Sequence, residues 1–341
     1  MAKERDISLD VAKAMLIMLM VLGHSLPGLC QFNTFVSYFN LPCFFFISGM
    51  LLKERYVTTN IKEGIVRKIK AYYVTYVKWG LFFVLMHNVF ALLHFFHSSY
   101  SLKEILNGCF CVVIMSKRDD LFLQGWFLSS LFWASIFSTL LICVLKKHKI
   151  YSKTNIVLAI SVLLVLAFFD FVPNISQFSV QTVLALTFFL SGWLSKEFIN
   201  KYSAFLEKYF WWLFLVPFIA SFEEQKLIIS VKGLDAILYY VIAIIGTFAF
   251  IGFSKWIAKY NTITPLLNYI GNRTLYILIF HILFMRFVSL TLYYCYDDIP
   301  IYELTKFYII EGYRLWFAIP YTIVGIGGSL LMWKLLHLNS K

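Results

Sequence analysis

Apolar residues fill long stretches of this chain, and charged residues gather in the short segments between them. The stretches are close to the roughly 20 residues that an α-helix needs to cross a bilayer. Such stretches with few charges indicate membrane-spanning helices rather than strands or amphipathic helices of a soluble domain. The pattern therefore predicts an all-α integral membrane protein with about ten transmembrane helices, at about 11–29, 34–52, 73–95, 125–145, 154–171, 178–195, 209–222, 236–254, 266–287 and 315–333.

The segments between the apolar stretches are short, and no internal repeat is visible. We therefore expect residues 1–341 to form a single transmembrane domain with no appended soluble domain. The N-terminus carries Lys3 and Arg5 before its apolar run, as a signal peptide does, but no small-residue cleavage site follows. We interpret this run as a first span that is retained.

The composition supports a membrane protein. Hydrophobic residues make up 60% of the chain and charged residues 14%, whereas a soluble domain has roughly 25% charged residues. The mean hydropathy is +0.76. The six cysteines show no spacing typical of a metal site, so we expect them to be small apolar residues and expect no bound metal.

The formal net charge of +12 raises the question of nucleic-acid binding. In a membrane protein, cytoplasmic loops collect Lys and Arg, and this bias sets the orientation. If the spans alternate from a cytoplasmic N-terminus, the outer side receives eight of the 30 Lys and Arg, and the cytoplasmic side receives the other 30 − 8 = 22. The eight are Lys103, Lys117, Arg118, Lys226, Lys232, Arg286, Lys306 and Arg314. This split predicts that both termini are cytoplasmic, and it explains the positive charge without a nucleic-acid partner.

Two polar residues stand out in the first span. Lys13 and His24 are 11 residues apart, a separation that is about 20° from three whole helical turns and rises roughly 16 Å. They therefore share a face, with Lys13 near the cytoplasmic interface and His24 beyond the midplane. Asp10 lies one turn before Lys13 and can pair with its ammonium group. Lys13 could instead extend to lipid headgroups, and His24 could be a hydrogen-bonded packing residue. Because polar groups inside a membrane are costly, we favour a functional His24.

The segments LDVAKAMLIMLMVLGH (residues 9–24) and NLPCFFFISGMLLK (residues 40–53) together resemble the start of the acyltransferase-3 family. These multi-span membrane enzymes move acetyl or related groups from acyl-CoA onto extracytoplasmic glycans. The family pattern is a basic residue, ten further residues and a histidine, which Lys13 and His24 match. Asp10 matches an acidic residue that often precedes the cation. Asn40 stands where members often have a histidine.

Further segments match in the expected order and extend the resemblance over nearly the whole chain. They are RKIKAYY (67–73), GWFLSSLF (125–132), FFLSGWLSK (188–196) and IGNRTLYILIFH (270–281). The resemblance implies a membrane O-acyltransferase of the bacterial inner (cytoplasmic) membrane. Its donor would be acetyl-CoA or another acyl-CoA, such as succinyl-CoA, and its acceptor a glycan or lipid-linked sugar.

The chemistry of acyl transfer assigns candidate roles to particular residues. An imidazole suits the general base near neutral pH, and His24 is the candidate. Lys13, Arg67, Lys68 and Lys70 would form a cationic mouth for the phosphates of CoA, although positive-inside signalling explains the last three equally well.

The remaining candidates have weaker signals. His281, expected at a depth similar to that of His24, would orient the base or hold the acyl carbonyl, or it is a structural histidine. Ser48 could line the donor channel, although a small residue that allows close helix packing is the simpler interpretation. Trp126 could stack on a sugar, and an aromatic belt residue explains it as well.

The main alternative function is a transporter or flippase for a lipid-linked glycan, which ten spans and abundant aromatic residues would also fit. Such proteins usually show repeated halves or broken helices, and the sequence shows neither. A sensor or anchoring protein without catalysis would not require the ordered set of motifs.

Overall fold

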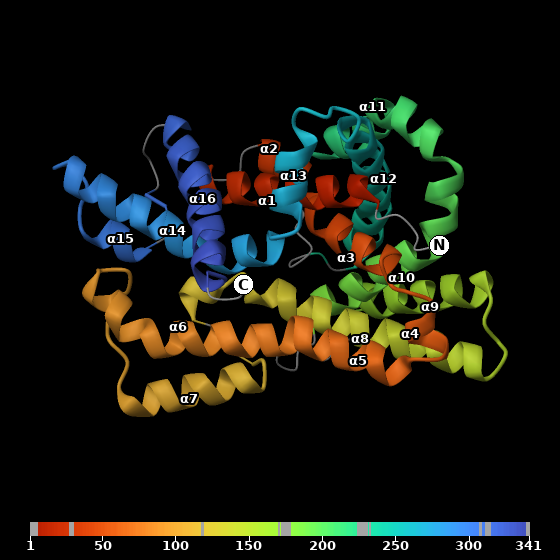
Figure 1. Cartoon of the computed structure of the whole chain (residues 1–341), viewed down its shortest axis with the longest axis horizontal. Coiled ribbons are helices and arrows are strands. Elements are labelled where there is room, and N and C mark those ends of the chain that lie inside the picture. Colours follow the sequence, from red (N-terminus) through yellow and green to blue (C-terminus); the bar gives the residue numbers. More distant parts are fainter. Residues whose placement is uncertain are drawn as a thin grey trace.

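The computed structural model describes residues 6–26, 31–116, 119–169, 171, 179–223, 231, 233–306, 309–310 and 315–338. The described part is helical and contains no strands (Figure 1). Within it, eight helical segments are long and apolar enough to cross a membrane. They are α1 (Ile7–Ser25), the continuous segment Ile61–Leu92, α8 (Gly125–Lys147), α10 (Val180–Lys201), α11 (Ser203–Ala220), α12 (Leu234–Ile257), α14 (Thr274–Cys295) and α16 (Ala318–Leu336). The predicted all-α membrane fold is confirmed, whereas the count of ten and the orientation stay predictions.

Two of the ten expected spans contain helices too short to count among these eight. The fifth expected span is α9 (Lys153–Phe168). The second is divided into α2 (Gln31–Ser37) and α3 (Asn40–Met50), with a turn at 38–39. Pro42 lies in the first turn of α3, where its missing N–H costs no helical hydrogen bond. Only the isolated polar residues Ser37 and Asn40 flank this turn, and the stretch around them is long and largely apolar, so the pattern predicts one helix.

The third span begins earlier than the expected residue 73. It consists of α5 (Ile61–Lys68), the π-helix η1 (Ile69–Val74) and α6 (Thr75–Leu92). The basic run at 67–70 is therefore helical and does not lie in a loop. π-helical turns within α-helices are rare and often occur at functional sites.

The remaining described elements are short. They are α4 (Arg55–Thr58), α7 (Leu102–Val113), η2 (Asp120–Phe122), α13 (Thr264–Gly271), α15 (Tyr302–Lys306) and η3 (Leu315–Phe317). Eight residues of the charge count lie outside the described residues: Lys3, Arg5, Lys117, Arg118, Lys226, Lys232, Arg314 and Lys341. Arg286, assigned to the outer side by the charge count, lies within α14 and is 5% exposed.

Two glycines bring the backbones of α3 and α10 into contact. A Cβ at Gly49 would lie 1.9 Å from the carbonyl oxygen of Phe189, and one at Gly192 would lie 1.9 Å from that of Phe46. Any side chain at either position would collide with the facing backbone. The motifs FFFISG and FFLSGW therefore form one helix crossing, in which small residues allow close approach.

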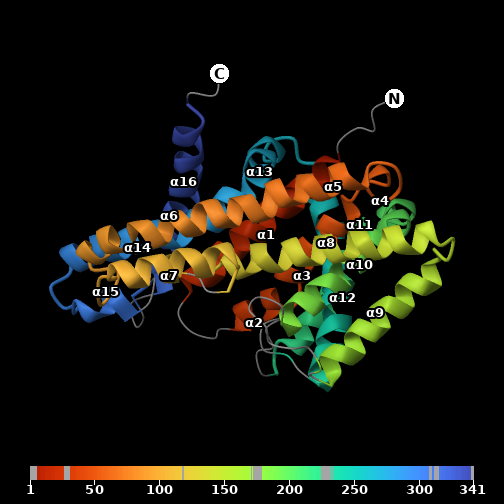
Figure 2. The ribbon, with the colours of Figure 1, turned by 90° about the horizontal axis from the view of Figure 1, so that it is seen from below.

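The first helix lies in the interior of the helical assembly. α1 packs against α3, α12, α13, α14 and α16, and five of its residues are completely buried: Val11, Ala12, Ala14, Leu16 and Val21. α6 and α8 run side by side in both views of the ribbon (Figures 1 and 2). The helix with the most distinctive motif is thus surrounded by helices from the C-terminal part of the chain.

Candidate active site

The predicted ion pair on α1 is present. Lys13 Nζ lies 2.7 Å from Asp10 Oδ1, and the two side chains are 21% and 5% exposed. α1 begins just after Asp6, whose carboxylate accepts a hydrogen bond from the backbone N–H of Ser8. This cap satisfies one of the free N–H groups at the helix start. The cation at the beginning of the first span is therefore held by a buried carboxylate one turn away.

Gly271 at the end of α13 packs directly on the backbone of α1. A Cβ at Gly271 would lie 2.0 Å from the carbonyl oxygen of Asp10. Gly271 belongs to the segment IGNRTLYILIFH, which resembles the family at the other end of the chain. The first-span motif and the segment IGNRTLYILIFH thus contact each other at Asp10, the residue whose carboxylate pairs with Lys13.

Lys13 lines a cavity of about 200 Å³ between α1, α3, α8 and α14, which we call the inner cavity. Its polar lining residues are Lys13, Ser48, Tyr72 and Thr274, and the rest of its lining is apolar. The Ser48 hydroxyl donates a 2.8 Å hydrogen bond to the carbonyl of Phe44 within its own helix. The inner cavity is therefore largely apolar, with a cation at one place in its wall.

A second cavity of about 210 Å³ adjoins the first, and we call it the basic cavity. Its lining includes Lys53, Arg67 and Lys68, and it shares Ser48, Leu51 and Tyr72 with the inner cavity. Because three residues line both, the two cavities lie directly next to each other.

The cations of the basic cavity differ in their environment. Arg67 is exposed and donates from Nε to Glu63 Oε1 over 2.8 Å. Lys68 is half-buried, donates to the carbonyl of Ser135 over 3.0 Å, and lies 5.0 Å from the ring centroid of Phe189. An anion in this cavity would thus meet the exposed Arg67, paired with Glu63, and the half-buried Lys68, held by a backbone carbonyl.

Among the predicted site residues, Asp10, His24 and His281 line neither cavity, and neither do Lys70 and Trp126. Lys70 lies in η1 and is exposed. Trp126 lies in the first turn of α8 and contacts the ring of Phe127, while Phe127 itself lines the inner cavity. Tyr72 lines both cavities, and the sequence analysis did not single it out. Its signal was present, since it lies within the RKIKAYY motif that supplied the basic residues.

The two histidines predicted to share a depth face each other. The ring centroids of His24 and His281 are 5.4 Å apart, with 28° between the ring planes. The nearest lining residues of the inner cavity on each helix are Met20 and Leu278, about one turn before the histidines. The pair therefore lies just beyond one end of the inner cavity.

His281 is held in one tautomer by its own helix. The side chain is completely buried, and Nδ1 lies 2.9 Å from the carbonyl oxygen of Ile277 and 3.0 Å from that of Leu278. Carbonyl oxygens only accept hydrogen bonds, so we assign the proton to Nδ1. Nε2 then carries a lone pair, and it has no hydrogen-bond partner among the described residues. A buried acceptor without a partner is costly, so its presence requires an explanation, and a functional role is one.

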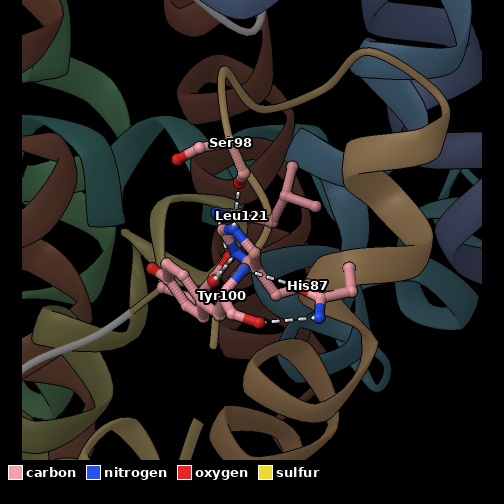
Figure 3. A network of polar contacts seen from close by, with 6 residues as sticks. His87, Ser98, Tyr100 and Leu121 are labelled. Atoms are coloured by element: carbon pink, nitrogen blue, oxygen red, sulfur yellow. Dashed lines mark hydrogen bonds and ion pairs between the residues drawn. The ribbon is translucent and has the colours of Figure 1, made fainter. Parts of the chain in front are cut away.

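A second buried histidine shows the opposite arrangement (Figure 3). His87 Nδ1 lies 2.8 Å from Asp119 Oδ2, and its Nε2 lies 3.1 Å from the carbonyl oxygen of Ser98. Its ring stacks on Tyr100, and Asp119 Oδ1 accepts a 3.0 Å hydrogen bond from the N–H of Leu121. Both ring nitrogens are engaged, so His87 joins α6 to the neighbouring loops and has no nitrogen free for proton transfer.

Burial also affects the carboxyl group of this network. It raises the pKa of Asp119, and the hydrogen bond from His87 opposes that rise. His87 lies near the outer end of the third expected span, but it is 3% exposed and therefore buried. Its partner Asp119 comes from a distant segment, which the apolar pattern does not connect with α6.

One comparison with known proteins gives a match. A family model described as an acyltransferase domain, that of the acyltransferase-3 family, matches residues 6–334. No curated protein and no solved structure matches the chain. The matched range includes both histidines, both cavities and the ion pair.

Proposed function

The chain belongs to the acyltransferase-3 family of membrane acyltransferases, and from this we propose a specific reaction. The enzyme moves an acyl group, acetyl in the simplest case, from acyl-CoA to a hydroxyl group of a glycan or lipid-linked sugar. The donor is cytoplasmic and the acceptor lies on the outer side, so the proposal places the enzyme in the bacterial cytoplasmic membrane.

The observation that carries this proposal is the position of the histidine pair. His24 and His281 stack on each other about one turn beyond the inner cavity, and Lys13 lies in the wall of that cavity. Titratable groups inside a membrane usually mark a pathway or a reaction centre. A cation and a base along one helix face could hold the two ends of an extended donor.

The basic cavity supports binding of the polyanionic end of CoA. Arg67 and Lys68 line it, and Lys13 lies in the adjoining inner cavity. Charge-assisted hydrogen bonds from such cations to phosphate oxygens are short and strong. The apolar inner cavity then receives the pantetheine arm, with Tyr72 and Ser48 where the two cavities meet. Lys70 contributes through its charge alone, because it lines neither cavity.

In the proposed reaction a ring nitrogen of His24 takes the proton of the acceptor hydroxyl group. The hydroxyl oxygen attacks the thioester carbonyl carbon, and the carbonyl electrons move onto its oxygen. When this intermediate collapses, the C–S bond breaks and the CoA thiolate leaves with the proton held by His24. The ester product and free CoA–SH account for all atoms, and His24 regains its neutral form.

His281 is proposed to position the acceptor or the base. Because its Nδ1–H is directed to backbone carbonyls, Nε2 is fixed as a hydrogen-bond acceptor. Such an acceptor can hold an O–H or an N–H group in one orientation. The reacting atoms are then more often in the geometry that the reaction requires.

The experiment uses the full-length chain purified into lipid nanodiscs. Radiolabelled acetyl-CoA is added with a bacterial glycan or lipid-linked sugar fraction, and label is measured in the carbohydrate product. We expect label transfer that requires both substrates. Movement of a lipid-linked sugar across liposomes without consumption of acyl-CoA would instead support the transporter alternative and contradict the proposal.

A further inference from the structure

A third cavity lies between α11 and α12, and we call it the α11–α12 pocket. Its volume is about 420 Å³. Most of its lining residues are charged or aromatic: Ala204, Glu207, Lys208, Phe210, Trp211, Trp256 and Lys259. None of these seven residues lines the inner cavity or the basic cavity. The pocket is therefore separate from the proposed donor path, and the inference drawn from it does not rest on the proposed reaction.

The pocket lies where two candidate spans end. α11 packs side by side with α12 (Figure 1). Glu207, near the start of α11, pairs with Lys259, just past the end of α12. Phe214, further along α11, contacts the ring of Phe250, which lies earlier in α12. The helices are therefore antiparallel, and the pocket lies at the membrane surface, on the side that the charge distribution assigns to the cytoplasm.

The charges that line the pocket sum to one net positive charge. Glu207 is paired with Lys259, and their side chains are 18% and 66% exposed. Lys208 is exposed and has no acidic partner among the described residues. Its Nζ lies 5.2 Å from the ring centroid of Tyr209. An anion entering the pocket would thus meet Lys208 and the exposed Lys259, and ammonium groups form strong charge-assisted hydrogen bonds with phosphate oxygens.

An apolar stripe continues from Lys208 along the exposed side of α11. Only three of the 18 residues of α11 are buried. At steps of three or four residues from Lys208 come Trp212, Leu215 and Ile219, which are 70%, 43% and 66% exposed. Residues at this spacing share one helix face. The stripe is about 16 Å long, close to half of a hydrocarbon core of about 30 Å. Its length and chemistry therefore match one acyl chain of one leaflet.

The aromatic lining of the pocket is typical of the headgroup level of a membrane. The ring centroids of Trp211 and Trp256 lie 6.3 Å apart. Tryptophan is enriched at this level because its ring is apolar and its N–H is a hydrogen-bond donor. Ala204, in the first turn of α11, also lines the pocket, and the start of a helix favours an anion. The pocket thus combines donors for an anionic group with surfaces for its apolar neighbours.

We propose that the α11–α12 pocket binds the headgroup of an anionic phospholipid, such as phosphatidylglycerol, from the surrounding membrane. Lys208 and Lys259 donate to the phosphate, and one acyl chain lies along the apolar stripe of α11. Basic pockets between spans on the cytoplasmic side bind headgroups of this kind. Phosphatidylethanolamine carries an additional ammonium group, which the two lysines repel, so the pocket selects the anionic lipid.

The test titrates the purified full-length chain in detergent with phosphatidylglycerol, or with phosphatidylethanolamine that carries the same acyl chains. Native mass spectrometry measures the bound lipid. We expect the first phosphatidylglycerol to bind several-fold more tightly than the first phosphatidylethanolamine, and Lys208→Ala to remove most of this preference. Lys147→Ala, which removes the same charge from the exposed end of α8, should retain it. Equal binding of the two lipids to the unmodified chain, or an unchanged preference in Lys208→Ala, would overturn the proposal.

Glu207→Gln should change the affinity in the opposite direction. The variant frees Lys259 from its ion pair without removing a cation, so phosphatidylglycerol should bind more tightly. Glu197→Gln is the matched control, because it frees Lys153 from an exposed ion pair outside the pocket and should leave the affinity unchanged. Unchanged or weaker lipid binding in Glu207→Gln would contradict a phosphate site at Lys259.

A competition experiment separates a lipid from a soluble phosphate compound. Glycerol phosphate carries the same kind of anionic group but no acyl chain, so it should not displace phosphatidylglycerol at equal concentration. Displacement would mean that the pocket recognises the phosphate alone, and the assignment to a membrane lipid would be wrong.

Discussion

His24 on α1 and His281 on α14 stack with their ring centroids 5.4 Å apart, although they come from opposite ends of the chain. α1 packs against α13, α14 and α16, which all belong to the C-terminal part. The site therefore forms only when α1 packs against these C-terminal helices. Changes that separate these helices should reduce activity even when they lie outside both cavities.

Gly271→Ala should disturb the site through packing. Its Cβ would lie 2.0 Å from the carbonyl oxygen of Asp10, so α13 would have to move away from α1. Overpacking of this kind costs about 1–3 kcal/mol, and we expect a lower Tm in detergent together with weaker acyl-CoA binding. Gly327→Ala is the matched control, because a Cβ there has no atom within 4 Å. Equal Tm values for the two variants would contradict the contact between α13 and α1.

The cations of the two cavities should control donor affinity. Lys13→Ala and Arg67→Ala are expected to weaken acyl-CoA binding several-fold, and the loss should be larger at low salt, where charge pairs are less screened. Lys147→Ala removes the same charge from the exposed end of α8 and should bind the donor normally. Titration calorimetry at two salt concentrations measures the effect. Unchanged affinity in both cavity variants would mean that these cations only set topology.

Asp119→Asn should destabilise the fold without removing chemistry. The variant leaves His87 without its carboxylate partner in a buried network, and removing one partner of a buried hydrogen bond costs about 1–3 kcal/mol. We expect a clearly lower Tm, with donor affinity retained below the transition. Asp120→Asn, at the exposed neighbouring position, is the control and should melt like the unmodified chain. A normal Tm for Asp119→Asn would show that this network contributes little to stability.

The predicted orientation can be measured with reporter fusions. Fusions at the C-terminus and after α8, near Lys147, should report the cytoplasm, and a fusion near Tyr302 should report the outside. These expectations follow from the distribution of Lys and Arg among the loops. A C-terminus on the outer side would mean an odd number of spans and would contradict the assignment of inner and outer loops.

Much of the fold could be predicted because hydrophobic length is a strong signal in membrane proteins. The positions of α8 and α12 follow the apolar stretches closely, whereas α14 begins and ends eight residues later than the predicted 266–287, because the start of that stretch forms the separate helix α13. The turn between α2 and α3 was missed, because Ser37 and Asn40 on either side of it are isolated polar residues in a stretch that is long and apolar enough to span a membrane. α7 was missed for a different reason. Its apolar run is too short to span a membrane, and only its contact with α6 reveals where it lies.

The candidate site was predictable where helical spacing determines contacts. The pairing of Asp10 with Lys13 follows from their separation of three residues, and the structure confirms it. The similar depths of His24 and His281 were expected, but their stacking depends on how α1 packs against α14. The engagement of both nitrogens of His87 depends on Asp119 and Ser98, which lie in loops with no regular spacing.

The most direct test of the proposed function compares acyl transfer by His24→Gln and His281→Ala with that of the unmodified enzyme in nanodiscs. Glutamine keeps a hydrogen-bonding side chain but cannot take a proton, and a general base contributes about 10²–10⁴-fold to the rate. We therefore predict that His24→Gln loses about that factor in turnover while it still binds acyl-CoA, and that His281→Ala loses less. Near-normal turnover of His24→Gln, together with loss of turnover in His281→Ala, would contradict the assignment of His24 as the base.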